Sequence, residues 1–102
     1  MNDRALNMLG LCARAGKVVT GEKAVVQAVR AGSCYVVLMD GGVAKNGDKA
    51  VSRACEGRGV PLLRVEPGRL GDAIGRPGRM AVGVTDPGMA GRIMELSHLG
   101  VQ

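Results

Sequence analysis

Aromatic side chains are almost missing from the sequence, which contains no Phe, no Trp and a single tyrosine, Tyr35. Hydrophobic residues still make up 46% of the 102 residues, so Val, Leu, Ile, Ala and Met must fill the core. Proteins that read single-stranded nucleic acids commonly stack the bases on aromatic rings. The composition therefore argues against a base-stacking sheet and against most modes of binding single strands.

Cysteine and histidine are too few and too scattered to suggest a metal site. Cys12, Cys34 and Cys55 lie more than twenty positions apart, and His98 is the only histidine. Zinc ligands are clustered in sequence, and disulfide scaffolds use dense, even sets of cysteines. We predict three reduced core cysteines, no metal and no other cofactor.

Long apolar runs are also missing. No run approaches the roughly 18 residues that a membrane-spanning helix needs, and the N-terminus has no charged segment followed by an apolar stretch. We therefore predict neither a membrane span nor a secretory signal, and we expect a cytoplasmic protein. The length suits one domain over residues 1–102, which buries roughly two-thirds of its unfolded surface without a metal or disulfide.

The charge of the chain is markedly positive. Fourteen Lys and Arg against nine Asp and Glu give a net charge of +5, and most of the cations are arginine. Arginine can form paired hydrogen bonds to phosphates and to guanine edges. This balance makes a polyanionic partner plausible, although charge alone does not establish one.

Hydrophobic periodicity predicts helices that alternate with short strands. Asp3 and Asp86 are expected to cap the first and last helices at their starts, and Gly16 is expected just after the first helix. Alternating helices and covered strands indicate an α/β fold, a three-layer α/β/α sandwich with a mixed, partly parallel sheet of about four strands. The predicted helices are 4–15, 22–31, 48–56, 67–74 and 87–96, and the predicted strands are 18–19, 35–39, 60–65 and 80–84.

An enzyme is not indicated. Residues 42–49 are similar to a phosphate-cradling loop, but Asp48 follows the second glycine where the loop needs Lys, and Ala50 follows Lys49 where it needs Ser or Thr. We interpret these residues as a turn before the third helix. A nucleotide-binding enzyme stays open as a third hypothesis, whereas no serine stands in a nucleophile elbow and no carboxylates pair.

The first candidate binding segment is residues 14–23, which leads from the first helix into the second. A helix start presents free backbone N–H groups, and Gly21 permits close approach of a polymer. Glu22 facing RNA would need to accept hydrogen bonds from a base edge such as that of guanine. The alternative is that Glu22 only complements the helix dipole.

The second candidate segment is residues 74–79, a short basic loop that follows an apolar residue. It has the chemistry to clamp an extruded nucleotide through Ile74, Arg76 and Arg79. The alternative is an ordinary solvated connection, because Gly and Pro mark loops in every kind of protein.

Four segments follow one another in an order that is typical of one known family: Gly16 to Glu22, the helix Ala24 to Gly32, the strand Tyr35 to Asp40, and Leu70 to Gly75. Over residues 4–96 the chain resembles the kink-turn RNA-binding ribosomal protein superfamily, which includes the L-seven-Ae and L-thirty-e ribosomal proteins. It is most similar to the small bacterial YlxQ-type members. The resemblance implies the same three-layer fold and a noncatalytic, monomeric protein that binds structured, kink-turn-like RNA, with ribosomal RNA as one candidate.

The resemblance also implies a site. Glu22 corresponds to a residue that reads guanine in sheared G·A pairs, and residues 74–79 correspond to the loop that packs against a protruding nucleotide. Gly21 and Val25 depart from the Asn and Lys of many relatives, which keeps a protein-interaction adaptor without RNA binding as the alternative function. The implied RNA-binding residues are Lys17, Thr20, Gly21, Glu22, Lys23, Ile74, Gly75, Arg76 and Arg79.

Overall fold

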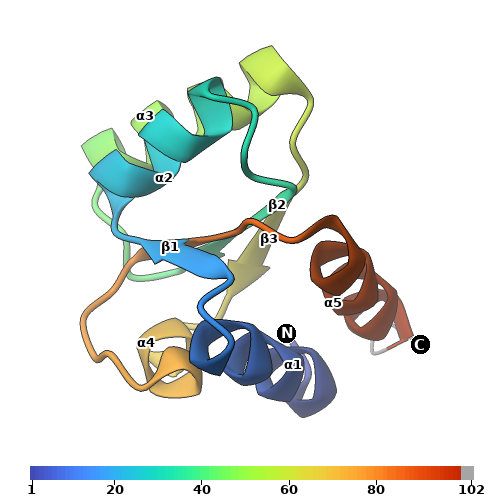
Figure 1. Cartoon of the computed structure of the whole chain (residues 1–102). Helices are drawn as coiled ribbons and strands as arrows, with labels where there is room; N and C mark the ends of the chain where they lie inside the picture. The colour runs from blue at the N-terminus through green and yellow to red at the C-terminus, as the bar shows by residue number, and fades with distance from the viewer. Residues whose placement is uncertain (100–102) are drawn as a thin grey trace.

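The computed structural model describes residues 1–99, which form five helices and four strands (Figure 1). Helices and strands alternate along the chain, as predicted. In chain order the elements are α1 (Asp3–Arg14), β1 (Val18–Thr20), α2 (Glu22–Arg30), β2 (Val36–Asp40), α3 (Lys45–Arg58), β3 (Leu62–Val65), α4 (Arg69–Ile74), β4 (Ala81–Val84) and α5 (Pro87–Leu99).

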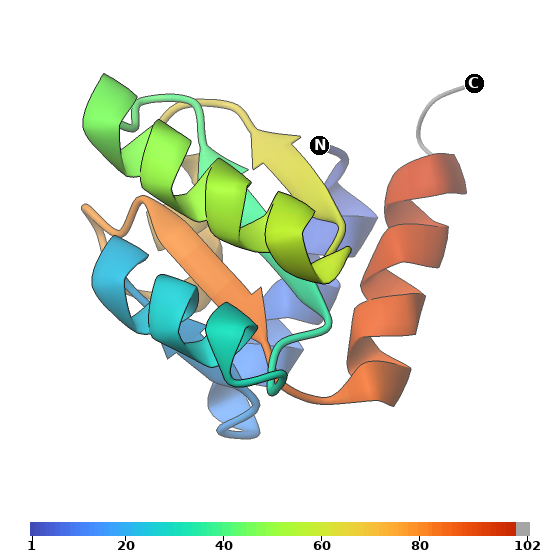
Figure 2. The ribbon, with the colours of Figure 1, turned by 90° about the horizontal axis from the view of Figure 1, so that it is seen from above.

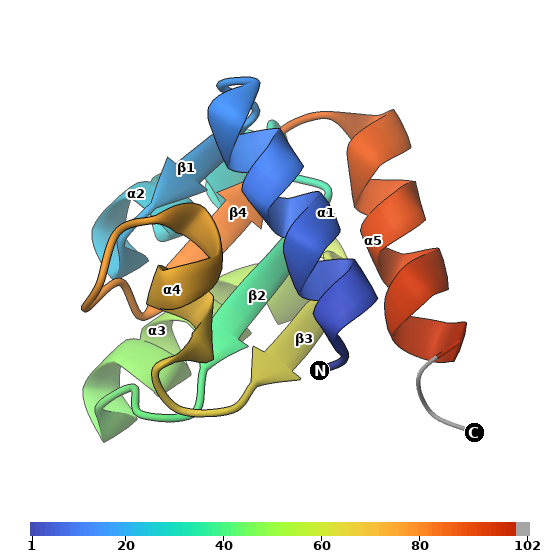
Figure 3. The same ribbon diagram turned by 90° about the horizontal axis from the view of Figure 1, so that it is seen from below.

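The four strands form one mixed sheet in the order β1-β4-β2-β3. Strand β4 is antiparallel to β1 and β2, whereas β2 and β3 are parallel. Helices α2 and α3 cover one face of the sheet, and α1, α4 and α5 lie on the other (Figures 1 and 3). The predicted three-layer α/β/α sandwich with a partly parallel sheet is confirmed.

Strand β2 is covered on both faces, which explains its unbroken apolar sequence. Val36 and Leu38 belong to the core cluster under α1, α4 and α5. Val37 and Met39 belong to the cluster under α2 and α3. All five residues of β2 are buried, as the continuous apolar run predicts.

The ends of the helices follow their sequence signals, with one correction. The side chain of Asn2, not Asp3, caps α1 by accepting from the Ala5 N–H at 2.9 Å, so the predicted cap is wrong by one residue. Gly16 follows α1 with a φ of 71°, and Asp86 caps α5 by accepting from the Met89 N–H at 2.8 Å. Both of these predictions are confirmed.

Helix α3 is longer than predicted. It begins at Lys45 and ends at Arg58, whereas periodicity gave 48–56. The Asp48 N–H donates to the Ala44 carbonyl at 3.0 Å, so the first turn forms although no side chain caps it. This polar, glycine-containing first turn has neither a side-chain cap nor an apolar period to mark it in the sequence. Residues 45–47 are helical, and the turn that we predicted for them is wrong.

The three cysteines are buried free thiols, as predicted. Burial, with a smaller contribution from Cys34, raises the pKa of the Cys55 thiol to about 11. A raised pKa keeps the thiol protonated and unreactive at neutral pH.

Within residues 1–99, none of the helices has the length and apolar character of a membrane span. In the same residues, no three potential metal ligands lie close enough together to form a metal site.

Gly83 in β4 leaves no room for a side chain. A Cβ there would lie 2.6 Å from the Sγ of buried Cys34 and 3.2 Å from Val19 Cγ2. We expect Gly83→Ala to lower the free energy of unfolding by about 1–3 kcal/mol through overpacking, measured as a lower urea midpoint with an unchanged slope. Gly91→Ala is the control, since nothing lies within 4 Å of a Cβ at that helical position. A parental midpoint for Gly83→Ala would contradict this packing.

Candidate functional site

The two candidate segments, far apart in sequence, lie together in the structure. The Gly21 N–H donates to the Ala81 carbonyl at 2.9 Å, which holds the start of α2 beside the start of β4. Nη1 of Arg79 lies 3.4 Å from the position of a Cβ on Gly21. Nη1 of Arg76 lies 3.4 Å from Thr20 Oγ1. The fold therefore combines the start of α2 and the loop 75–79 into one surface.

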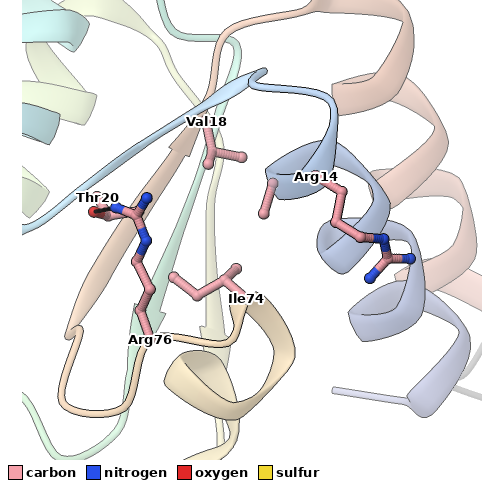
Figure 4. A pocket seen from close by; sticks show the side chains of 6 residues that line it. Arg14, Val18, Thr20, Ile74 and Arg76 are labelled. Atoms are coloured by element: carbon pink, nitrogen blue, oxygen red, sulfur yellow. Dashed lines mark hydrogen bonds between the residues drawn. The ribbon is translucent and has the colours of Figure 1, made fainter.

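A small cavity opens at this junction, between the end of α1, β1 and the end of α4 (Figure 4). Its volume is about 120 Å³. The side chain of Ile74 points toward Val18, Arg76 extends to Thr20, and the guanidinium of Arg14 is directed away from the cavity. The cavity thus has an aliphatic wall and a cationic edge.

A broader hollow of about 470 Å³ adjoins the cavity at Thr20. Glu22 and Lys23 from α2 and Arg79 from the loop line it together. Gly21 precedes α2 with a φ of 97° and caps the helix with no side chain, so the first N–H groups of α2 are left to face a ligand. One carboxylate, two cations and open N–H groups share this hollow.

Glu22 rests on the backbone of the neighbouring helix α3. A Cβ at Gly47 would lie 2.6 Å from the Glu22 carboxyl carbon and 3.0 Å from Oε1, so only glycine allows the carboxylate to lie there. Gly47 itself is buried, whereas Glu22 is half-buried. The position of the Glu22 carboxylate is thus determined by a residue in another helix, and the sequence analysis missed Gly47.

Among the implied residues of the first segment, Lys17 lies farthest along the chain from Gly21, although its neighbour Val18 lines the cavity beside Ile74. The Lys17 carbonyl accepts from the Thr85 N–H at 2.9 Å, at the end of the sheet where β4 finishes. Gly21 lies at the opposite end, where β4 begins, about 13 Å away at 3.3 Å per strand residue. The other implied residues, Thr20, Gly21, Glu22, Lys23, Ile74, Gly75, Arg76 and Arg79, come from the two segments that meet.

The loop 75–79 is folded against α4. Gly75 ends α4 with a φ of 70°, and the Arg76 N–H donates to the Gly71 carbonyl at 2.9 Å. A Cβ on Gly71 would lie 2.7 Å from the Arg76 carbonyl oxygen, so glycine allows this close return. The loop therefore presents Arg76 and Arg79 from a defined backbone.

A buried carboxylate that the sequence analysis missed anchors the start of α4. Asp40, 1% exposed at the end of β2, accepts from the N–H groups of Gly42 at 2.8 Å, Gly68 at 3.0 Å and Leu70 at 3.4 Å. These bonds connect β2 to the segment that leads through α4 to Ile74. The sequence feature that could have identified Asp40 is a carboxylate that directly follows a buried apolar run.

Residues 42–49 do not form a phosphate-cradling loop. Lys45 and Lys49 are exposed on α3, and Asp48 is paired with Arg64 of β3 through oxygens at 2.9 and 3.0 Å. The hydrogen bonds from Arg64 lower the pKa of the Asp48 carboxyl, and a hydrogen bond from Ser52 lowers it by a smaller amount. An ionised carboxylate among these residues disfavours a bound phosphate.

Comparisons with known proteins agree on one family. The model of the ribosomal protein L7Ae/L30e/S12e/Gadd45 family matches residues 3–93. The chain is 38% identical over 90 residues to the RNA-binding protein YlxQ of Bacillus subtilis, covering 87% of this chain and 90% of that protein. It is 30% identical over 94 residues to the YlxQ protein of Enterococcus faecium, covering 91% and 90% of the two chains.

Two solved structures are similar in fold. A protein of unknown function from Bacillus halodurans superposes with a TM-score of 0.87 at 32% identity, covering 93% of this chain and 97% of that one. A 15.5kD RNA-binding protein from Giardia lamblia superposes with a TM-score of 0.75 at 18% identity, covering 97% and 92%. The second likeness concerns the fold alone.

Proposed function

Because the chain belongs to the ribosomal protein L7Ae/L30e/S12e/Gadd45 family, we propose that it is a noncatalytic RNA-binding protein that recognises a structured, kink-turn-like RNA element. The protein acts in the cytoplasm as a monomeric single domain. Ribosomal RNA is the candidate RNA that contains the recognised element. Two relatives at 38% and 30% identity carry the name of an RNA-binding protein.

One observation carries the proposal: the start of α2 and the loop 75–79 form a common surface with one carboxylate among cations. Glu22, Lys23 and Arg79 line the same hollow, and Arg76 adjoins Thr20 at its edge. Phosphates would repel an unpaired carboxylate, whereas guanine N1–H and N2–H groups would donate to it. Lys23, Arg76 and Arg79 would hold phosphates, and Glu22 would read the base.

The cavity beside Ile74 suits the protruding nucleotide that the family resemblance implies. Its volume of about 120 Å³ accommodates a small flat group, and Ile74 and Val18 supply an apolar wall. Recognition here would use aliphatic packing and charge, which fits a chain with a single aromatic residue. Lys17, at the other end of β1, would contact backbone outside this site.

The position three residues after Glu22 differs from that of many relatives. Val25 is fully buried against the sheet, so it contacts the core and not a ligand. The cations that adjoin Glu22 are instead Lys23 and Arg79. Phosphate contacts beside Glu22 would therefore come from Lys23 and Arg79 and not from residue 25.

The test is titration of the purified protein with a kink-turn stem and with a matched unkinked duplex at two salt concentrations. We expect the kinked stem to bind more tightly. Arg76→Ala should weaken binding to both RNAs and lower the salt slope by about one. Glu22→Ala should mainly remove the preference for the kinked stem, because it deletes base reading and not phosphate contacts.

The outcomes separate the hypotheses. Equal and strongly salt-dependent binding of both RNAs by the parent would leave only electrostatic attraction. If both variants bind like the parent, the assigned site is wrong. Failure of the parent to bind either RNA would favour the protein-interaction adaptor instead.

A further inference from the structure

A groove that adjoins the site described above runs between α2 and α3. The two helices lie side by side with their starts at the same end (Figure 2). Glu22 rests on Gly47 at that end, and the Arg58 guanidinium donates to the Arg30 carbonyl at the other. The groove between them has a volume of about 530 Å³.

Small residues form the floor of the groove, and polar residues form its rim. Val26, Gly47 and Ala50 are the small and apolar members of its lining. The rim residues from α2 are Lys23, Gln27 and Arg30, and Asn46 comes from α3. Glu22 and Lys23 also line the hollow of the proposed RNA site, so the groove continues directly from that site.

The surface around the groove carries an excess of positive charge. Lys23 and Arg30 are exposed on α2, and Lys49 and Arg53 are exposed on α3. Arg53 follows Ala50 by three residues, which places it next to the groove on the helix surface. The nearby carboxylates are Glu22 at the start of the groove and the exposed Glu56, which follows Arg53 by three residues, so four cations face two carboxylates around the groove.

The cations of this surface have no acidic partner in the part of the chain that the structure describes. The side-chain ion pairs within residues 1–99 involve Arg64, Arg69 and Arg92, and none involves a cation of this surface. Unpaired, exposed cations along a groove attract phosphates and release counterions when they bind them. The arrangement therefore offers several phosphate positions in a row.

We propose that the α2–α3 groove binds the sugar–phosphate backbone of an RNA arm that extends beyond the Glu22 site. The inference rests on the proposed function, because the arm is positioned by the RNA element bound there. Arg30 and Arg53 contact phosphates from opposite sides of the groove. The small side chains of Gly47 and Ala50 let the backbone lie close to the helices.

The chemistry of the surface favours RNA over a docked protein. Arg is common in both kinds of interface, but the centres of protein interfaces are also enriched in large aromatic and Met anchors and are poor in Lys. The large exposed hydrophobic residues within the described part of the chain are Leu11 and Tyr35, which do not line the groove. A groove with a floor of Val, Ala and Gly and a cationic rim fits a polyanion better.

The experiment compares three RNAs: a minimal kink-turn stem, and two stems in which one or the other helical arm is lengthened. The parent protein is expected to bind one lengthened stem more tightly than the minimal stem. The variant R30Q/R53Q is expected to lose that gain and to lower the salt slope for the long stem by about two. Over a fourfold salt change, a slope difference of about two alters relative affinity by roughly 16-fold. Binding of the minimal stem should not change.

R4Q/R92Q is the control, because it removes the same charge from exposed arginines of α1 and α5. It should keep the gain from the longer arm. The inference is overturned if neither longer arm strengthens binding, or if R30Q/R53Q binds the long stem like the parent. In both cases a preserved effect of Glu22→Ala would show that the proposed function stands. Failure of the parent to bind any stem would overturn both.

Discussion

Gly47→Ala is expected to remove most of the preference for a kinked stem while leaving the fold as stable as before. The new Cβ would lie 2.6 Å from the carboxyl carbon of Glu22, so the carboxylate must leave its position. Loss of one base-reading contact costs about 1–3 kcal/mol of discrimination, which is roughly 5- to 150-fold. The measurement is the affinity ratio for kinked and unkinked RNA.

The stability of this variant should not fall, because the displaced group is the end of a flexible side chain. Alanine also favours a helix over glycine by about 1 kcal/mol, so the urea midpoint should stay or rise. Selectivity and stability are therefore expected to change independently, which a simple folding defect would not produce.

Gly57→Ala is the matched control for Gly47→Ala. Gly57 lies in the same helix, and nothing lies within 4 Å of a Cβ at that position. It should give the gain in helix stability without loss of selectivity. The double variant Glu22→Ala/Gly47→Ala should lose no more selectivity than Glu22→Ala alone, because the two substitutions remove the same interaction. Full selectivity in Gly47→Ala would show that Gly47 does not hold Glu22 in its reading position.

Much of the fold could be predicted because its signals are local. The unbroken apolar run of β2 indicated a strand covered on both faces, and Asp86 followed by Pro87 marked the start of α5. Boundaries were less certain where the local signals were ambiguous. Asn2 and Asp3 are both good caps, and the uncapped, glycine-containing start of α3 resembled a turn.

The site was harder to predict because it depends on contacts between segments distant in sequence. The residues of the two segments were identifiable, but the pairing of β1 with β4, which continues to Gly21 and Ala81, is what brings them together. The family resemblance implied Lys17 as a basic contact residue, yet the extended strand β1 separates it from Gly21. Gly47 has no signal of its own, because its importance comes from the side chain of Glu22 lying on it.

Asp40→Ala is expected to cause the largest loss of stability, about 3–5 kcal/mol in the free energy of unfolding. The variant leaves the N–H groups of Gly42, Gly68 and Leu70 without their acceptor. Each buried donor without a partner costs about 1–3 kcal/mol, and water that reaches the partly buried glycine N–H groups reduces the sum. The urea midpoint should fall with an unchanged slope.

Two comparisons test whether the loss comes from this network. Asp86→Ala removes a carboxylate that accepts from one helix-start N–H and should cost only about 1 kcal/mol. Asp40→Asn keeps one acceptor oxygen but turns an NH2 group toward the remaining donors, so its stability should lie between those of the parent and Asp40→Ala. A cost for Asp40→Ala no greater than that for Asp86→Ala would contradict the network.

Asp40→Ala should also affect the candidate site through α4. Gly68 and Leu70 hold the start of this six-residue helix, and its end positions Ile74 and the loop that carries Arg76. In Asp40→Ala, amide hydrogens of α4 and the loop 75–79 should exchange faster than those of α2, because local opening requires less free energy once the anchor is lost. RNA affinity should then weaken for kinked and unkinked stems alike, because Arg76 and Arg79 are the proposed phosphate contacts. The preference for the kinked stem, which we propose for Glu22, should persist. Loss of the preference with unchanged exchange in α4 would instead place Asp40 in the base-reading part of the site.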